Sequence, residues 1–345
     1  MRVLVTGGGG FLGRRISEML LARGDRVRVF GRRQQPEMVA AGAECVGGDI
    51  RQAEAVAAAA RGCDAVIHTA AMAGVWGSRQ LFFETNVTGT EHVIHACLQN
   101  AIGRLVFTSS GSVVFGRRAI EQGDESLPYP RHYLAAYPES KAEAEKKVLA
   151  ANGLPIGGGR FLLTCSLRPH LIWGPGDPHL LPRIVARAKA GRFSQLGRGT
   201  NRLDLTYIDN AAAAHVQAVN ALQPAAWVAG NAYFIGDAEP VAIWSWMREL
   251  LARLGLPPIR CRVPFAMAYA TALKLELLHR VFPSLGEPSL TRFVVLQLTR
   301  SHWFSHARAT QDFGYRPAVD NATGLARAVE WLQSLQVTGG AKRTI

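Results

Sequence analysis

Two side chains near the middle of the chain have the types and the spacing for proton transfer. Tyr137 and Lys141 are four residues apart in a segment that reads as helical, so both lie on one helix face. A phenol loses its proton near pH 10 in water, and a neighbouring ammonium would lower that pKa. Tyr137 could then donate or accept a proton near neutral pH. Ser110, 27 residues earlier at the end of an apolar strand, could hydrogen-bond a developing alkoxide.

A Tyr and a Lys at this spacing are common on helix surfaces, so the interpretation needs a second signal. That signal is a glycine-rich segment at residues 6–13. It lies between an apolar strand at 3–5 and an amphipathic helix expected over 11–23. A strand, a glycine turn and a helix in this order bring a dinucleotide pyrophosphate to a helix N-terminus. The alternative is a plain strand-to-helix turn with surplus glycine.

The glycines of this turn have separate expected roles. Gly7 would permit the tight turn, Gly10 would let phosphates approach the backbone, and Gly13 would let the helix pack on the strand. Phe11 and Leu12, at the start of the helix, are included among the expected cofactor contacts. The spacing fits a glycine at every third position, but it also contains G-x-G-x-x-G, so spacing alone does not identify a family.

The residues after the second strand, expected at 27–30, predict the cofactor. An acidic residue there would bind a ribose 2′-hydroxyl, whereas an Arg would accept a 2′-phosphate. This chain has Gly31, Arg32 and Arg33, and no acid. Since Arg binds phosphate through charge-assisted hydrogen bonds, we predict NADP(H) rather than NAD(H). Two solvated surface arginines with weak selectivity are the alternative.

Other polar or small residues follow the ends of the expected strands. Asp49 after the third strand either meets the adenine or caps the Ala-rich helix that follows, and the sequence leaves both readings open. Asn86 lies within a helix expected over 79–100, where its low propensity points to a polar role. The remaining expected cofactor contacts are Ile50, Ala70, Ala71 and Pro169.

Composition excludes several classes of function. The 345 residues carry a net charge of +13, but the cations are dispersed without interleaved aromatics, so we expect no nucleic-acid binding. Five scattered cysteines without a C-x-x-C pair indicate a reducing compartment and no zinc site. A strand that starts at the second residue predicts no signal peptide and a cytoplasmic protein. No histidine pair has a third ligand at suitable spacing, so no metal site is expected; the candidates were His68, His92, His95 and His170.

Together these motifs resemble the extended short-chain dehydrogenase/reductase family over essentially the whole chain. The resemblance implies catalysis by Ser110, Tyr137 and Lys141, with cofactor contacts at the glycine turn and Asp49. It also implies a Rossmann-type doubly wound parallel sheet, an α/β fold, with a smaller and mostly helical C-terminal substrate domain. A homodimer is the family expectation, through the helices around 86–100 and 137–152. The matching segments are 6–13, 48–50, 68–71, 86–90, 108–110 and 137–141.

Within this family the chain is similar to the 3β-hydroxysteroid dehydrogenase branch, on the segments 108–115, 167–177, 204–211, 291–293 and 302–304. The pattern is most similar to bacterial enzymes that reduce 2-alkyl-3-oxoalkanoic acids with NADPH in long-chain olefin biosynthesis. Nucleotide-sugar enzymes of the family carry an Asn after strand six, whereas this chain has only His, Leu, Ile and Trp at 170–173. An apolar substrate with a carboxylate is therefore favoured. The alternatives are a 3β-hydroxysteroid (4-carboxysterol) dehydrogenase and a non-catalytic NADP-binding scaffold.

The C-terminal half alternates less regularly, and the chain is expected to leave and re-enter the nucleotide domain. We predict that residues 1–170 and 202–240 form that domain, that 171–201 and 241–335 form the substrate domain, and that 336–345 form a flexible tail. Residues 156–160 read as a loop insertion without chemistry. The most apolar stretch, 264–282, is too short to span a bilayer. It is a core or lid helix, a flap over an acyl substrate, or a surface that docks on a membrane or within a multi-enzyme assembly.

Overall fold

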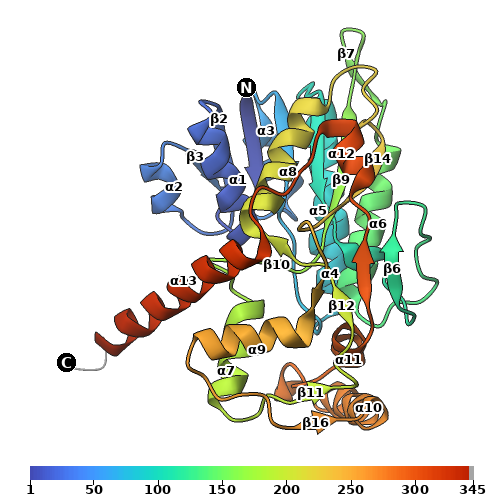
Figure 1. The fold of residues 1–345 in the computed structure, drawn as a ribbon. Coiled ribbons are helices and arrows are strands. Elements are labelled where there is room, and N and C mark those ends of the chain that lie inside the picture. Colours follow the sequence, from blue (N-terminus) through green and yellow to red (C-terminus); the bar gives the residue numbers. More distant parts are fainter. Residues whose placement is uncertain (342–345) are drawn as a thin grey trace.

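A computed structural model describes residues 1–341, which are organised around a seven-stranded parallel sheet (Figure 1). The strand order is β14-β9-β5-β4-β1-β2-β3, and the connection reverses direction between β1 and β4. This is a doubly wound Rossmann sheet, as the sequence predicted, and its ligands belong at that reversal. The strands are β1 (Arg2–Thr6), β2 (Arg26–Gly31), β3 (Glu44–Gly47), β4 (Ala65–His68), β5 (Arg104–Thr108), β9 (Leu163–Pro169) and β14 (Asn231–Ile235).

Helices cover both faces of this sheet, because its strands are apolar on both sides. In β1, Val3 and Val5 point into one core and Leu4 into the other, and all three are at most 1% exposed. The first core is closed by α1 (Phe11–Ala22) and α8 (Ile208–Ala221), which pack on each other. The second is closed by α3 (Ala53–Ala60), α5 (Gly89–Gln99) and α6 (Ala136–Ala150), while the short α2 (Pro36–Ala40) precedes β3.

The single helix expected over 79–100 is three consecutive segments in the structure. These are α4 (Arg79–Phe83), a π-helical turn η1 (Glu84–Thr88) and α5. The sequence did not predict the π turn, which contains Asn86. Such turns are rare and occur often at functional sites.

A second, four-stranded sheet connects four distant parts of the chain, with the order β15-β12-β17-β6. Its strands are two to four residues long and lack a period-2 pattern. They are β6 (Ile120–Gly123), β12 (Arg202–Leu203), β15 (Val241–Ala242) and β17 (His302–Phe304). The sequence indicates only β12, because residues 201–208 read as extended. Two further parallel pairs are β10 (Ile172–Trp173) with β13 (Thr206–Tyr207), and β11 (Gln195–Leu196) with β16 (Arg262–Val263). The insertion at 156–160 forms an antiparallel hairpin, β7 (Pro155–Gly157) and β8 (Arg160–Phe161).

The remaining elements are mostly helices beyond the carboxyl ends of the main strands (Figure 1). Helix α12 (Ala307–Phe313) instead packs on β14 and α8. Part of the segment 241–335, which the sequence assigns to the substrate domain, therefore lies against the nucleotide domain. Residues 120–123 and 202–203, which the sequence assigns to the nucleotide domain, belong instead to the second sheet. These elements are η2 (Gly111–Val114), α7 (Leu180–Lys189), α9 (Ile243–Arg253), α10 (Phe265–Val281), η3 (Pro283–Leu285), α11 (Arg292–Thr299), α12 (Ala307–Phe313) and α13 (Asn321–Ala341).

Two helix ends differ from what the sequence predicts, which is a helix over 209–222 capped by Asp209 and a last helix that ends near Gln333. Asp209 does not cap α8, because Tyr207 is the N-cap residue and the Asp209 carboxylate instead accepts a hydrogen bond from Arg15 Nε at 2.6 Å. Helix α13 continues to Ala341 instead of ending near Gln333. Residues 336–341 are therefore helical and not part of the expected tail, whose last four residues lie outside the described part of the chain. Over residues 1–341, none of the helices has the length and apolarity needed to cross a membrane.

Candidate functional site

The glycine turn between β1 and α1 is shaped by close contacts that only glycine allows. Gly7 has φ +70°, and a Cβ there would lie 2.8 Å from the Ala70 backbone. A Cβ at Gly13 would lie 2.3 Å from the Gly7 carbonyl oxygen and 2.7 Å from Thr69 Oγ1. The predicted roles of Gly7 in the turn and of Gly13 in packing are therefore confirmed. Gly10 is the N-cap residue of α1 and supplies no side chain to its first N–H groups, which suits the binding of an anion.

This turn opens on a cavity of about 660 Å³ at the carboxyl ends of the strands. A cavity of this size accommodates a large part of a dinucleotide. Most of the predicted contacts line it: Gly7, Gly10, Arg32, Arg33, Asp49, Ile50, Ala70 and Ala71. The sequence analysis missed other lining residues, among them Arg14, Gln35, Arg51, Thr69 and Met72. Their positions depend on loops that fold over the turn.

Four arginines give this cavity a positive rim. The Asp49 carboxylate accepts hydrogen bonds from the Arg51 guanidinium, the shortest at 2.8 Å. This contact, with a smaller effect of Arg32, lowers the Asp49 pKa to about 2. Asp49 does not cap α3, whose N-cap is Gln52, so that reading is wrong. Arg14 is paired with Glu18 and Glu37, whereas no acid within residues 1–341 pairs with Arg32 or Arg33. These two guanidinium groups remain free to bind an anion.

Asn86 stabilises the wall of the cavity through hydrogen bonds to Met72, which lines it. Its amide oxygen accepts from Met72 N at 2.7 Å, and its amide nitrogen donates to the Met72 carbonyl oxygen and to Ser140 Oγ. Asn86 is 1% exposed and does not line the cavity. The polar role of Asn86 is therefore structural, because its hydrogen bonds connect the loop after β4 to α6. Pro169, the last residue of β9, likewise does not line the cavity.

A chain of hydrogen bonds connects the glycine turn to the π-helical turn through His68. The Thr90 hydroxyl donates to the Asn86 carbonyl oxygen, so it accepts from His68 Nε2 at 3.0 Å. His68 Nδ1 then accepts from Thr6 Oγ1 at 2.6 Å. Burial and the nearby Lys141 lower the pKa of His68 to about 3. His68 is thus a neutral structural residue, and no cluster suited to a metal occurs over residues 1–341.

The three predicted catalytic residues come from two elements that pack on each other, η2 and α6, and none of the three lines the cavity. Ser110 precedes η2, directly after β5, and accepts a hydrogen bond from Ser112 N at 3.2 Å. Tyr137 and Lys141 share one face of α6. The Ser110 hydroxyl hydrogen-bonds Ser112 Oγ at 2.8 Å, and its proximity to the Tyr137 phenol favours the ionised form of that phenol. Lys141 is 2% exposed, and its ammonium lies 4.0 Å from the centroid of the Phe107 ring.

The pKa values of these groups differ from the expectation that Lys141 lowers the pKa of Tyr137. Burial raises the pKa of Tyr137, and the Ser110 hydroxyl only partly offsets the rise. Burial also lowers the pKa of Lys141 to about 7, against the opposing effect of Glu145. Desolvation disfavours both charged forms and dominates in the protein alone. The structure therefore holds a buried lysine that gains from any hydroxyl or anion placed against it.

The second half of α6 carries a buried acid, Glu145, which is paired with a second buried cation. The Arg168 guanidinium on β9 donates to the Glu145 carboxylate at 2.7 Å and 3.1 Å. Glu145 also accepts from Ser166 Oγ and from the Tyr129 hydroxyl. The guanidinium lowers the pKa of Glu145, although burial opposes this. This network ties α6 to β9, and no local sequence pattern predicts it.

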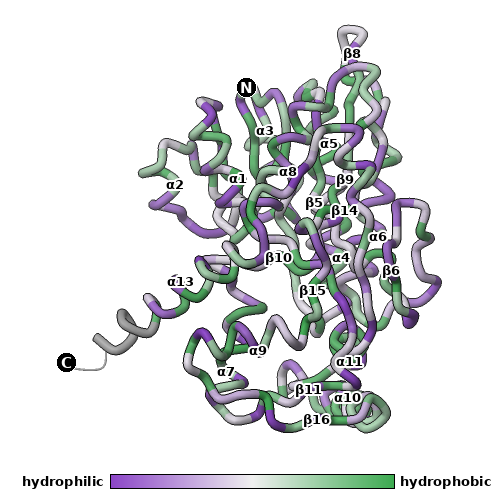
Figure 2. Tube along the Cα trace, viewed as in Figure 1, coloured by the Kyte–Doolittle hydropathy of each residue, from purple (hydrophilic) through white to green (hydrophobic). Residues whose placement is uncertain are grey.

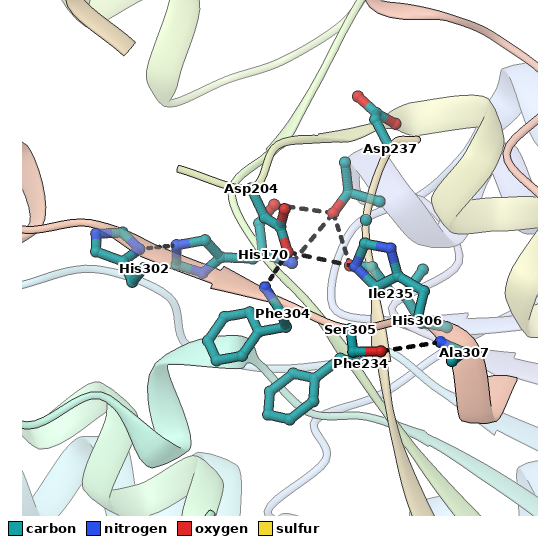
Figure 3. Close-up of polar contacts among 12 residues, drawn as sticks. His170, Asp204, Phe234, Ile235, Asp237, His302, Phe304, Ser305, His306 and Ala307 are labelled. Carbon is teal, nitrogen blue, oxygen red and sulfur yellow. Dashed lines mark hydrogen bonds and ion pairs between the residues drawn. The ribbon is translucent and has the colours of Figure 1, made fainter. Parts of the chain in front are cut away.

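Two histidines and an aspartate join the second sheet to the end of β9 (Figure 3). His302 Nε2 donates to the Gln297 carbonyl oxygen, so its Nδ1 accepts from His170 Nε2 at 2.6 Å. The pKa of His170 is lowered by burial and by His302, so the pair is neutral. Asp204 Oδ2 accepts from Phe304 N at 2.8 Å. A Cβ at Gly111 would lie 3.1 Å from His170 Nδ1, so this network supports the backbone next to Ser110.

The doubly wound sheet, the glycine turn and the Ser, Tyr and Lys side chains define a short-chain oxidoreductase site. Residues 4–265 match the model of the 3-beta hydroxysteroid dehydrogenase/isomerase family. The chain belongs to this family, whose members use a nicotinamide dinucleotide, and it is an oxidoreductase that acts on CH–OH and C=O groups.

Similar proteins of known name cover nearly the whole chain. A 2-alkyl-3-oxoalkanoate reductase of Stenotrophomonas maltophilia is 44% identical over 329 residues, covering 95% of this chain and 98% of that protein. One of Shewanella oneidensis is 45% identical over 325 residues, covering 94% and 84%. A 3-beta-hydroxysteroid dehydrogenase of Mycolicibacterium neoaurum is 35% identical over 342 residues, covering 97% and 92%.

Solved structures of nucleotide-sugar enzymes share the fold. The dTDP-glucose 4,6-dehydratase of Streptomyces venezuelae with bound NAD has a TM-score of 0.74 at 26% identity, covering 96% of this chain and 97% of that one. The UDP-glucose 4-epimerase of Thermus thermophilus in complex with NAD has a TM-score of 0.71 at 27% identity, covering 96% and 99%. The fold is thus shared across enzymes with very different substrates.

Proposed function

We propose that this protein uses NADPH to reduce the 3-oxo group of a long-chain 2-alkyl-3-oxoalkanoic acid to the 3-hydroxy acid, within long-chain olefin biosynthesis. The observation that carries the proposal is the placement of Ser110, Tyr137 and Lys141 on η2 and α6, which pack on each other, together with the glycine-turn cavity. Two arginines without an acidic partner within residues 1–341 line that cavity. The two reductase relatives at 44% and 45% identity support the substrate class.

The residues fit a nicotinamide dinucleotide, because the glycine turn leaves the space that a Cβ would fill and Lys141 is buried without an acid in contact. The bound cofactor supplies the hydride. Tyr137 gives a proton to the carbonyl oxygen, and Ser110 orients that oxygen by hydrogen bonding. Lys141 holds the ribose hydroxyls of the cofactor, and Ser110 favours the ionised phenol. Backbone N–H groups at Phe11, Leu12 and Gly13 would meet the pyrophosphate.

The preference for NADPH rests on Arg32 and Arg33. They follow β2, line the cavity and have no acidic partner within residues 1–341. Replacing both with alanine removes charge-assisted contacts to a 2′-phosphate, so NADPH should bind about tenfold more weakly or worse, with NADH unchanged. Titration of protein fluorescence with each cofactor measures this. Arg61→Ala, outside the cavity, is the control, and a wild-type preference for NADH would contradict the assignment.

A second candidate is the oxidation of a 3β-hydroxysteroid, such as a 4-carboxysterol, with NAD(P)⁺. The family match and the mycobacterial relative favour it. Both reactions use the same three residues in opposite directions, so the catalytic geometry does not separate them. In both cases the segment 170–173 favours an apolar ligand, because it has no Asn and its His170 and Trp173 side chains bond to His302 and Asp237.

The deciding experiment is a substrate panel measured by the absorbance of the reduced cofactor. NADPH oxidation with 2-alkyl-3-oxo acids is expected, with little or none with 3-ketosteroids or nucleotide sugars. Cofactor reduction with sterols and NAD(P)⁺ would instead support the second candidate. NADPH binding without consumption over the whole panel would indicate a scaffold that only binds the cofactor.

A further inference from the structure

The loop between β2 and α2 brings one side chain against the glycine turn. This loop, residues 32–35, is a hydrophilic segment next to α2 (Figure 2). A Cβ at Gly9 would collide with the side-chain amide of Gln35, and a Cβ at Gly31 would lie 3.3 Å from its Nε2 atom. The Gln35 amide therefore lies between the glycine turn and the end of β2, and Gln35 lines the cavity there.

The hydrogen-bonding capacity of this amide is not used within the protein. Its oxygen, Gln35 Oε1, is buried and has no hydrogen-bond partner within residues 1–341. A buried amide oxygen without a partner is unfavourable, and the same amide carries two N–H donors. Rotation of the amide toward a ligand breaks no hydrogen bond at the oxygen. The side chain therefore gains from any polar ligand that lies against it.

The backbone of Gln35 is fixed, although its side chain is not used by the helix that follows. Gln35 is the N-cap residue of α2, and its carbonyl oxygen accepts from Met38 N at 3.0 Å and from Val39 N at 3.1 Å. The side chain makes no capping hydrogen bond. Gln is also not among the residues that favour an N-cap position. The helix thus holds the amide at the cavity without needing it for capping.

The charges around the amide favour an anion. The two acids that line the cavity, Glu37 and Asp49, are each ion-paired with an arginine. Arg32 and Arg33 line the same cavity and have no acidic partner within residues 1–341. After the second strand of this fold, an acid would accept from the ribose 2′-hydroxyl of a dinucleotide. This chain instead places an uncharged amide beside two free cations.

We propose that Gln35 is a specificity-determining residue for the adenosine ribose of the cofactor, and that its amide donates a hydrogen bond to the 2′-phosphate. Hydrogen bonds to a charged acceptor are stronger than neutral ones, so one amide donor adds to the two guanidinium groups. An acid at this position would repel the phosphate, and the neutral amide removes that repulsion. The inference rests on the NADPH preference in the proposed function and adds a residue that the charge pattern does not reveal.

Isothermal titration calorimetry of the full-length protein with two cofactor fragments tests this without turnover. Adenosine 2′,5′-bisphosphate and adenosine 5′-monophosphate differ only in the 2′-phosphate. Gln35→Met keeps the length of the side chain and removes its hydrogen bonding. It should bind the bisphosphate about tenfold more weakly, with the monophosphate changed by less than about threefold. Gln35→Glu adds a like charge at the same place and should weaken the bisphosphate by at least about thirtyfold.

The matched control is Gln34→Glu, which adds the same charge one residue earlier on an exposed side chain. Because solvent and salt screen that charge, the bisphosphate should bind no more than about threefold more weakly. Thermal melts without ligand should show that all variants fold.

Two results would overturn the role of Gln35 while the wild type still preferred the bisphosphate. One is equal weakening by Gln34→Glu and Gln35→Glu, which would indicate a general charge effect. The other is unchanged or tighter binding of the bisphosphate by Gln35→Met. A wild type that bound both fragments equally would instead contradict the NADPH preference itself, and with it the phosphate contact of Gln35.

Discussion

The two halves of α6 bury charge in opposite ways. In the first half, Lys141 is 2% exposed and its ammonium lies against the Phe107 ring, without an acid in hydrogen-bond contact. In the second half, Glu145 is fully buried and accepts from Arg168, Ser166 and Tyr129. Two turns of one helix thus hold an uncompensated charge and a fully compensated one.

This difference separates a residue kept for chemistry from residues kept for structure. An isolated buried charge destabilises the fold, and it persists where a ligand uses it. A paired buried charge contributes little net stability, but removing one partner is strongly destabilising. We therefore expect changes in the first half of α6 to affect activity, and changes in the second half to affect stability.

The largest expected effect is the loss of activity that follows a change in the first half of α6. Tyr137→Phe removes the proton donor, so kcat should fall about 10³-fold, with NADPH affinity and melting temperature nearly unchanged. Stopped-flow reduction of the substrate and cofactor titration measure these quantities. The control is Tyr133→Phe, which removes only the hydrogen bond to the Val113 carbonyl oxygen. A variant at residue 137 with wild-type rates would refute the catalytic assignment.

A change in the second half of α6 should lower the stability of the protein. Glu145→Gln leaves the Arg168 guanidinium buried without its anion, which should reduce the free energy of unfolding by about 3 to 4 kcal/mol. Urea denaturation of the protein with and without NADPH measures the change. A loss below about 1 kcal/mol would show that the pair is not the support of α6 that its geometry indicates.

Lys141→Met should separate stability from activity. The folded pKa of Lys141 is about 7, below its ordinary value of 10.5, so the folded state binds fewer protons than the unfolded state between these pH values. Stability therefore rises with pH across this window. The variant should be more stable by on the order of 2 kcal/mol below pH 7, with the gain vanishing near pH 10.5, and inactive. Melting curves of the variant and the wild type at pH 6 and pH 10 test the sign of this stability change. A variant that is less stable than the wild type at pH 6 would contradict the prediction.

The smallest expected effect is on one arm of the Glu145 network. Tyr129→Phe removes the hydroxyl that donates to Glu145 Oε1 at 2.7 Å, while Arg168 and Ser166 remain. The free energy of unfolding should fall by about 1 kcal/mol, with kcat unchanged. A parallel drop in kcat would mean that the two halves of α6 are not independent.

Sequence reasoning succeeded where the chemistry is local. The glycine turn and the Tyr and Lys pair depend on short segments whose residue types are restricted by backbone contacts or helix spacing. It failed on the second sheet, whose strands are joined only by pairing across distant parts of the chain. The sequence analysis also missed the π-helical turn, because the hydrogen bonds from Asn86 to Met72 and Ser140 are tertiary contacts.

The sequence by itself determined the doubly wound fold and the glycine turn, and it predicts the three catalytic residues. Each follows from neighbouring residues and from the order of strand, turn and helix. Only the tertiary structure decided which charges are compensated. The pKa of Lys141 depends on the aromatic and neutral groups that surround it, and the exposure of α10 depends on which of its two apolar faces the rest of the chain covers. Desolvation is a property of the packed molecule, and no local pattern encodes it.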